Sequence, residues 1–450
     1  MHAPHLTWFQ IIRLGLVQTA LGGIVVLTTS TVNRVMVVEL ALPAMLPGAL
    51  VAWHYSLQIL RPRFGYGADQ GRRMTPWIIG GMAVLAIGGS LAAVATALMA
   101  ASFWAGLALS VIAFTLIGAG VGAAGTSLLA MLAKRAAPQR RPAAATIVWI
   151  MMIAGFAVTA VAAGAFLDPF SLDRLVIVAT AVSVIALVVA VLAVTGIEGR
   201  YEGLPAPVPP TETRFGCGFP VALAEVWAEP RARLFTIFIF VSMLAFSGQD
   251  LILEPFAGLI FGLSPGATTQ LSGLQNGGVL AGMVTVALAG TWLRHDGAGS
   301  PKRWTIGGCL LSAVALGGLA VGGWLATDWP LRSNIVLLGY ANGVYAGAAI
   351  ATMMTLAGAG AERREGTRMG VWGASQAIAF GIGGFLGTVA VDGVRALTGS
   401  GLFAYGSVFA VEAVLFLVAT GLAVRILALS AGPEDAPAAE PSSQLALGVG

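Results

Sequence analysis

The sequence predicts an all-α integral membrane protein, a bundle of about twelve transmembrane helices built as two six-helix halves. Three observations predict this fold class: long apolar runs with few charges, a one-sided distribution of basic residues, and an internal repeat. The chain has 450 residues, of which 57% are hydrophobic and 10% are charged. A soluble domain normally carries about a quarter charged residues, so this composition excludes a soluble globular protein.

The apolar runs are long enough to cross a lipid bilayer, as in residues 78–116 and 175–194. A helix of about 20 apolar residues matches the hydrocarbon core of a bilayer. Backbone inside lipid must pair its own hydrogen-bonding groups, so these runs are predicted to be helices. Breaks at Gly, Pro and charged residues divide the runs into individual spans. The predicted spans are 14–31, 43–60, 77–100, 104–132, 144–167 and 174–196 in the first half, and 234–260, 268–293, 304–326, 333–358, 369–391 and 402–428 in the second.

The spans and the segments between them divide the chain into four parts. The N-terminal six-helix half covers residues 1–196, and the C-terminal half covers residues 233–430. A cytoplasmic linker at residues 197–232 contains several prolines and is predicted to carry a short surface helix at residues 221–227. The tail at residues 431–450 is predicted to be disordered. No small-residue cleavage site follows the first apolar run, so we interpret that run as a spanning helix and not as a signal peptide.

The basic residues test this number of spans. If the N-terminus is cytoplasmic, 20 of the 24 Lys and Arg residues fall on the cytoplasmic side. The opposite side keeps one Arg in each of four short loops: Arg34, Arg174, Arg332 and Arg395. Cytoplasmic loops of membrane proteins carry an excess of Lys and Arg, so both termini are predicted to be cytoplasmic, and the protein to lie in a bacterial inner membrane.

An internal repeat relates the two halves. A shift of 223 residues superposes Gly120 on Gly343 and Trp149 on Trp372, and it superposes the basic loop that lies between them in each half. Both copies run from the fourth span of a half into its fifth span. Membrane transport folds are often built from duplicated halves, so the repeat favours a duplication over chance similarity.

A polar loop joins the second predicted span to the third. It contains Gly67, Asp69, Gly71, Arg72 and Arg73. This stretch resembles the signature loop of the major facilitator superfamily, although it is one residue shorter between Asp and Gly. In that family the Asp faces a helix N-terminus and the arginines pair with carboxylates, so the resemblance implies a major facilitator-type bundle and a conformational role for the loop. The alternative is a basic loop that only sets topology.

Polar side chains inside the predicted spans are few, and each is a candidate functional residue because burying it in lipid is costly. Asp250 and Glu254 are one helical turn apart in the seventh span, immediately before Pro255, which is predicted to kink the helix. They are candidates for proton coupling or for bracing neighbouring helices. The remaining candidates are Glu412 in the twelfth span and, at the outer end of the first span, Asn33, Arg34 and Glu39.

The second span carries the one histidine expected inside the membrane. His54 and Gln58 share a helix face, with Trp53 and Tyr55 beside them. A neutral imidazole can be an axial ligand of a metal held in a macrocycle, or it can be a structural residue that hydrogen-bonds a neighbouring helix. The predicted cavity is mainly apolar and aromatic, which suits a large hydrophobic ligand better than an ion or a sugar.

The sequence contains no grouping typical of an enzyme. No Ser-His-Asp set, no cluster of metal ligands and no paired acidic motif for a metal diphosphate is present, and Cys217 and Cys309 have no metal or disulfide spacing. We therefore expect no catalytic residues, no bound metal ion and no enzymatic activity. The lipid bilayer is the expected environment, and nucleic acid is not an expected partner.

Three segments resemble the PucC family: residues 15–43, residues 72–81 and residues 248–256. The stretch from Asn33 to Glu39 is the most specific of them, and the resemblance spans nearly the whole chain. The short loop and the Thr-Pro-Trp at residues 75–77 are more similar to the branch named bacteriochlorophyll synthase chain.

The resemblance implies a membrane assembly factor for photosynthetic light-harvesting complexes in the intracytoplasmic membrane. Such a protein binds bacteriochlorophyll, as ligand or cargo, or delivers it to light-harvesting antenna polypeptides beside chlorophyll synthase. His54 is then a candidate pigment contact. The alternative is a secondary transporter of a hydrophobic or amphipathic small molecule, with Asp250 or Glu254 as a proton-coupling group.

Overall fold

The computed structural model describes residues 5–57, 73–137, 140–198, 227–292, 300–325, 329–358 and 365–430. In these ranges the regular elements are helices, and eleven of them are long and apolar enough to cross a membrane. The predicted fold class, an all-α integral membrane bundle of about twelve helices, is confirmed. The loop residues Gly67, Asp69, Gly71 and Arg72, together with Gln58, lie outside the described residues, as do most of the linker and the whole tail.

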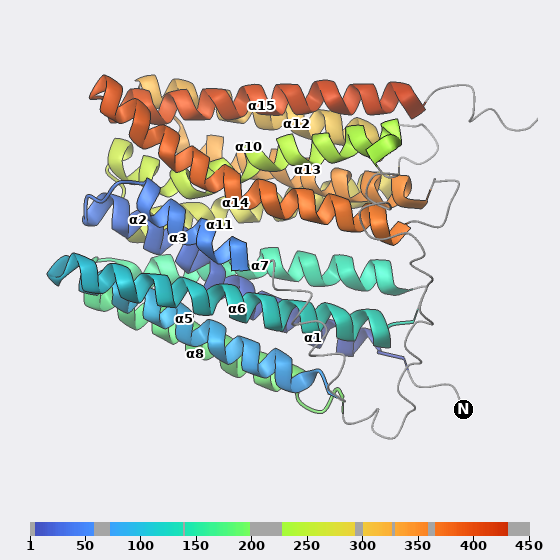
Figure 1. Cartoon of the computed structure of the whole chain (residues 1–450), viewed down its shortest axis with the longest axis horizontal. Coiled ribbons are helices and arrows are strands. Elements are labelled where there is room, and N and C mark those ends of the chain that lie inside the picture. The colour runs from blue at the N-terminus through green and yellow to red at the C-terminus, as the bar shows by residue number, and fades with distance from the viewer. Residues whose placement is uncertain are drawn as a thin grey trace, which may run out of the picture.

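The described chain forms twelve long helical segments, which we call rods because one of them joins several consecutive helices (Figure 1). The first rod joins α1 (Trp8–Val26), η1 (Leu27–Thr31), α2 (Val32–Arg34) and η2 (Val35–Glu39). The remaining rods of the first half are α3 (Met45–Ser56), α5 (Thr75–Ala101), α6 (Phe103–Arg135), α7 (Arg141–Leu167) and α8 (Leu172–Val194). The second half consists of α10 (Pro230–Phe261), α11 (Pro265–Trp292), α12 (Pro301–Leu325), α13 (Leu331–Gly358), α14 (Glu365–Thr398) and α15 (Gly401–Ser430).

The first rod is longer than predicted. Its expected end at residue 31 rests on the polar residues that follow, but the helix continues to Glu39 through two π-helical stretches. Those polar residues meet protein, because the side chain of Asn33 donates to the backbone carbonyl of Leu251 in the other half, with 2.6 Å between nitrogen and oxygen. At its other end, Thr7 caps the rod with a capping box.

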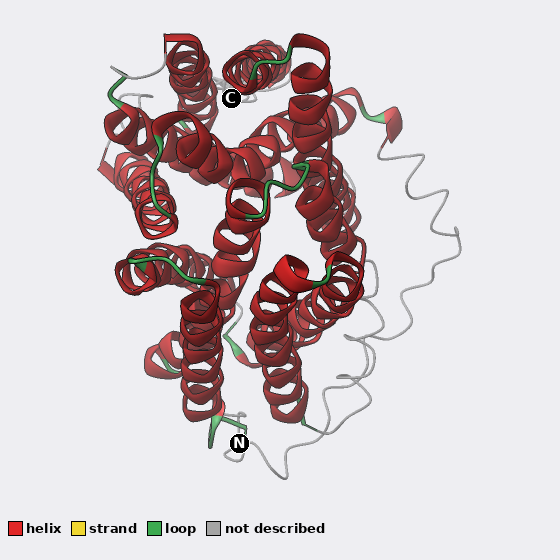
Figure 2. Ribbon diagram, turned by 90° about the vertical axis from the view of Figure 1, so that its left-hand side faces the viewer, coloured by secondary structure: helices red, strands yellow, loops and turns green. Residues whose placement is uncertain are grey.

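Each half has its own apolar core. One core gathers side chains of α1, α5, α6 and α8, and the other gathers side chains of α10, α12, α13 and α15. Figure 2 shows the helices end-on, and in Figure 1 the first half lies below the second. The most extensive contacts between the halves are those of α7 with α11 and of α3 with α14, and the end of the first rod also contacts α10 and α11.

The two ends of the bundle differ in their connections. One end of the bundle holds the turns at residues 40–44, 102, 168–171, 262–264 and 399–400. We call it the clamped end, because polar contacts described in the next section join the two halves there. It lies on the left in Figure 1, whereas the start of α1 and the end of α15 lie on the right. Glycines let the halves approach closely near the clamped end, since a Cβ atom on Gly164 would lie 2.7 Å from the carbonyl oxygen of Gly266.

Candidate functional site

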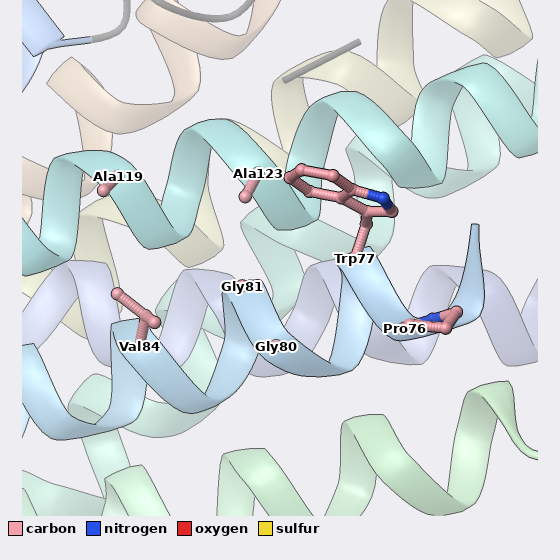
Figure 3. A pocket seen from close by; sticks show the side chains of 7 residues that line it. All are labelled: Pro76, Trp77, Gly80, Gly81, Val84, Ala119 and Ala123. Atoms are coloured by element: carbon pink, nitrogen blue, oxygen red, sulfur yellow. The ribbon is translucent and has the colours of Figure 1, made fainter. Parts of the chain in front are cut away.

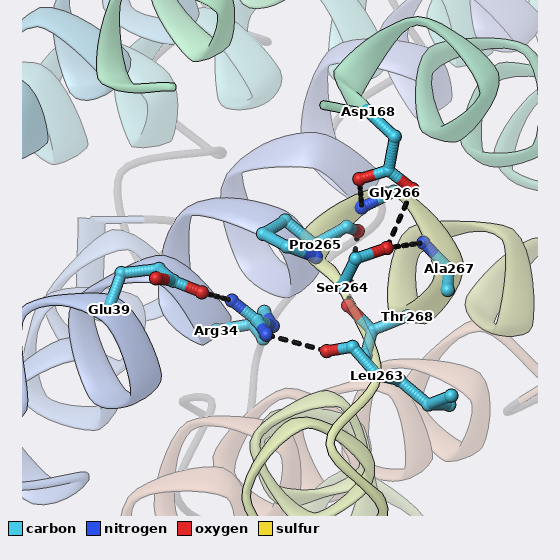
Figure 4. A network of polar contacts seen from close by, with 9 residues as sticks. All are labelled: Arg34, Glu39, Asp168, Leu263, Ser264, Pro265, Gly266, Ala267 and Thr268. Carbon is cyan, nitrogen blue, oxygen red and sulfur yellow. Dashed lines mark hydrogen bonds and ion pairs between the residues drawn. The ribbon is translucent and has the colours of Figure 1, made fainter. Parts of the chain in front are cut away.

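Arg34 is buried between the two halves at the clamped end. It lies inside the first rod with 2% of its side chain exposed, which corrects the prediction that it occupies a short outer loop. Its guanidinium donates to the carbonyl of Leu263 over 2.8 Å and forms an ion pair with Glu39 (Figure 4). A buried arginine needs such partners because an unpaired charge is costly to desolvate. These partners explain how the helix can carry this charge between the halves.

Glu254 belongs to the same group of residues. Its side chain is almost fully buried, accepts a hydrogen bond from the hydroxyl of Ser272 on α11, and lies within electrostatic range of Arg34. The helix α10 continues past it through Pro255. The structure thus brings the first rod, α10 and α11 together around Arg34 and Glu254.

Two acids that the sequence analysis missed join the halves. The carboxylate of Asp168, after α7, accepts from the Ser264 hydroxyl over 2.6 Å and from the Gly266 amide over 3.3 Å. The carboxylate of Asp392, on α14, accepts from the amides of Ala44 over 3.1 Å and of Met45 over 2.7 Å. Each acid therefore sits at the N-terminus of a helix in the other half, where the helix dipole favours negative charge.

These two contacts, which we call the acidic clamps, are related by the internal repeat. The shift of 223 residues places Asp168 one position before Asp392, and α3 and α11 are the second helices of their halves. An acid at nearly equivalent positions of both halves is the feature of the sequence that could have predicted these contacts. Taken singly, each acid follows the end of a predicted span, where charged residues are common.

Three of the four candidate pigment residues are described, and they point in different directions. Trp53 is 45% exposed and donates to the hydroxyl of Thr115 on α6, whereas His54 is 2% exposed and its carbonyl lies against Gly118. Tyr55 is half-buried and faces α14. The helix therefore directs Trp53 toward α6 and Tyr55 toward α14, so these residues do not line a single cavity.

An aromatic row crosses from one half to the other. The rings of His54 and Tyr55 are 4.8 Å apart between centroids, and Tyr55 lies 5.8 Å from Phe380 of α14. Phe380 in turn lies 5.7 Å from Phe246 of α10. Tyr55, Phe380 and Phe246 each keep some accessible surface, so none of the three is sealed in the core.

The remaining acids, Asp250 and Glu412, lie close enough for their charges to repel. Asp250 keeps accessible surface although protein surrounds it, and Glu412 is buried against Gly248. Asp250 and Glu254 thus belong to different groups despite their helical spacing. In the described part of the chain, no group of three or more His, Cys, Asp and Glu residues could hold a metal ion.

An apolar groove of about 380 Å³ lies between α5 and α6 on the side of the bundle (Figure 3). Its walls include Pro76 and Trp77 of the segment that resembles the PucC family, and Gly80 leaves open space at its floor. The complete lining is Pro76, Trp77, Gly80, Gly81, Val84, Ala119 and Ala123. The groove lies in the first half, apart from the aromatic row.

Comparison with known proteins agrees with the sequence resemblance. The family model described as PUCC protein matches residues 31–431. The protein of Rhodobacter capsulatus named bacteriochlorophyll synthase 44.5 kDa chain is 52% identical over 424 residues, which cover 94% of this chain and 96% of that protein. Protein PucC of Rhodobacter capsulatus is 29% identical over 437 residues, which cover 93% and 92%.

Solved structures show the same architecture. A mutant of the nucleoside transporter NupG matches with a TM-score of 0.66 and 15% identity, covering 93% of this chain and 99% of that chain. At this level of identity the likeness shows the fold alone, and the fold hosts many different functions.

Proposed function

Because the chain belongs to the PucC family, we propose that it is a membrane assembly factor that binds bacteriochlorophyll and delivers it to light-harvesting antenna polypeptides. The observation that carries this proposal is the 52% identity, over nearly the full length of both chains, to a protein named bacteriochlorophyll synthase 44.5 kDa chain. On this proposal the protein acts beside chlorophyll synthase in the intracytoplasmic membrane, with both termini in the cytoplasm. On this proposal the protein itself catalyses no reaction.

The aromatic row supports a pigment as the ligand. Tyr55, Phe380 and Phe246 offer aromatic faces between the halves, and a macrocycle can stack on such faces. In this arrangement Tyr55 contacts the pigment directly, and His54 either holds Tyr55 in place or coordinates the pigment's magnesium.

The absorption spectrum of protein purified from pigment-making cells tests the proposal. We expect bacteriochlorophyll in stoichiometric amount, and we expect Tyr55→Ala to reduce it severalfold because the variant removes one stacking face. Trp53→Phe is the matched control, because Trp53 lies on the same helix but contacts Thr115 outside the row. In the His54→Ala variant, a shifted pigment band would indicate magnesium coordination, whereas an unchanged band would indicate a supporting role.

The transporter hypothesis predicts the opposite outcome. A colourless protein whose uptake of an amphipathic solute collapses in the Asp250→Asn variant would overturn the assembly role. Reduced pigment content of the antenna complexes in a deletion strain, with normal pigment synthesis, would support the assembly role.

A further inference from the structure

A layer of buried polar side chains crosses the core of the second half. We call it the polar layer and define it as Gln249 of α10, Ser312 of α12, Asn342 of α13 and Glu412 of α15. Gln249, Ser312 and Asn342 are fully buried, and Glu412 is 4% exposed. Four helices thus each contribute one oxygen-bearing side chain to the interior of an otherwise apolar core.

Contacts between these helices place the four residues at one level of the bundle. The hydroxyl of Ser312 donates to the side-chain oxygen of Asn342 over 3.0 Å. One turn away on each of α13 and α15, the rings of Tyr345 and Phe416 lie 5.7 Å apart, which brings Asn342 and Glu412 to the same height.

The helix α10 joins the polar layer at Gly248. A Cβ atom on Gly248 would lie 2.3 Å from a carboxylate oxygen of Glu412, so the carboxylate occupies the space that this glycine leaves free. Gln249 is the next residue along the helix. A side chain at position 248 would therefore displace the carboxylate of Glu412 from its present position.

Most of the polar atoms in the layer have no hydrogen-bond partner. These atoms are both oxygens of Glu412, both amide atoms of Gln249 and the amide nitrogen of Asn342. Buried polar atoms in proteins are almost always paired, since leaving one unpaired costs about 1–3 kcal/mol. A polar ligand bound at this level of the bundle would pair these atoms.

The negative charge of Glu412 indicates which kind of ligand the polar layer would bind. Glu412 forms no ion pair within the described part of the chain, and the ion pair of Arg34 with Glu39 lies at the clamped end. Asp250 lies close enough to repel it and keeps accessible surface. A cation would relieve this repulsion, and Asp250 would offer the point from which the cation enters.

We propose that the polar layer is a binding site for a monovalent cation of the size of Na⁺. Carboxylate, amide and hydroxyl oxygens are the ligands that hard cations prefer, and water completes their coordination. Glu412 is the carboxylate within the layer, and it balances one positive charge, whereas Asp250 lies at the point of entry and keeps accessible surface. The bound water also pairs the amide N–H groups of Gln249 and Asn342. The site is separate from the aromatic row and does not depend on the proposed pigment function.

Thermal unfolding of the full-length protein in detergent tests the site. We expect the unfolding midpoint to rise with NaCl to saturation while choline chloride keeps the ionic strength constant, because a ligand that binds the folded state stabilises it. Glu412→Gln should abolish the rise. Glu254→Gln is the matched control, because it removes a buried carboxylate of α10 that lies outside the layer, and it should keep the rise.

A second variant keeps the test decisive if Glu412→Gln fails to fold. Gln249→Leu retains the carboxylate and should raise the half-saturating NaCl concentration by about tenfold, as the loss of one polar contact does. A wild-type midpoint that does not respond to NaCl, or an equal response in Glu412→Gln, would overturn the proposal. Stabilisation by acid alone, without any NaCl dependence, would also overturn it and would assign a proton to Glu412.

Discussion

At the scale of single residues, the polar groups between the halves depend on partners far away in the sequence. Arg34 meets the carbonyl of Leu263 and lies in range of Glu254, both more than 200 positions along the chain. The sequence identifies Arg34 as a candidate because of its position near a span. It does not reveal the partners, because they depend on how two halves pack.

Replacement of Arg34 tests its structural role. In Arg34→Ala, Glu254 loses its nearby positive charge and the carbonyl of Leu263 loses its donor. We expect a loss of about 3–5 kcal/mol in unfolding free energy, because a buried charge left without its partner is strongly destabilising. Equilibrium unfolding in detergent with a graded denaturant measures this loss.

Arg174→Ala is the matched control for this prediction. Arg174 is another of the four arginines predicted on the outer side, but its hydrogen bond to the carbonyl of Asp168 is exposed. The control should change stability by no more than about 0.5 kcal/mol. Equal effects of the two substitutions would contradict a special role for Arg34.

At the scale of helices, the spans were predictable and their contacts were not. Long apolar runs define α5, α8 and α12 within a few residues, because the bilayer fixes how long a spanning helix must be. The repeat predicted equivalent positions but not equivalent surroundings. Trp149 is 40% exposed, whereas its repeat partner Trp372 is buried.

The glycine pair of the repeat does have a shared role in close helix packing. A Cβ atom on Gly120 would lie 2.6 Å from the amide nitrogen of Leu85, and one on Gly343 would lie 2.0 Å from the carbonyl oxygen of Val279. Both neighbours are backbone atoms, which cannot move without displacing a helix. Glycine at these two positions therefore permits α6 to pack on α5 and α13 to pack on α11.

Alanine substitutions on α13 test this packing. Gly343→Ala should destabilise the protein by about 1–3 kcal/mol, since the added methyl group forces α13 away from α11. Gly347→Ala, one turn further along α13, should be neutral or stabilising, because its Cβ atom would lie at an ordinary distance of 3.5 Å from Met283. Unfolding midpoints of the two variants provide the comparison, and a larger loss in Gly347→Ala would refute the packing argument.

At the scale of the whole molecule, the repeat explains why the clamped end is held twice. The two acidic clamps join opposite helix pairs, so each half grips the other through an equivalent contact. In transporters built from two such halves, one half rocks against the other. Among the described residues, both acidic clamps and the Arg34 contact join the halves at the clamped end, so that end is closed in this conformation.

Removal of both clamps should therefore shift the molecule toward a state that is open at the clamped end. In the double variant Asp168→Ala and Asp392→Ala, two helix N-termini lose their acceptors, at a cost of about 1 kcal/mol each. Spin labels at the exposed positions Phe166 and Leu402 should report a longer or broader distance distribution across that end. Labels at Phe9 and Val424, at the opposite end, should report a shorter distance, because a rigid half that opens at one end closes at the other.

Asp173→Ala is the control, because this exposed acid lies in the first turn of α8 and is not one of the two acids that contact the other half. If both label pairs lengthened together, the clamps would be general stabilising contacts and not the lock on one end of the bundle.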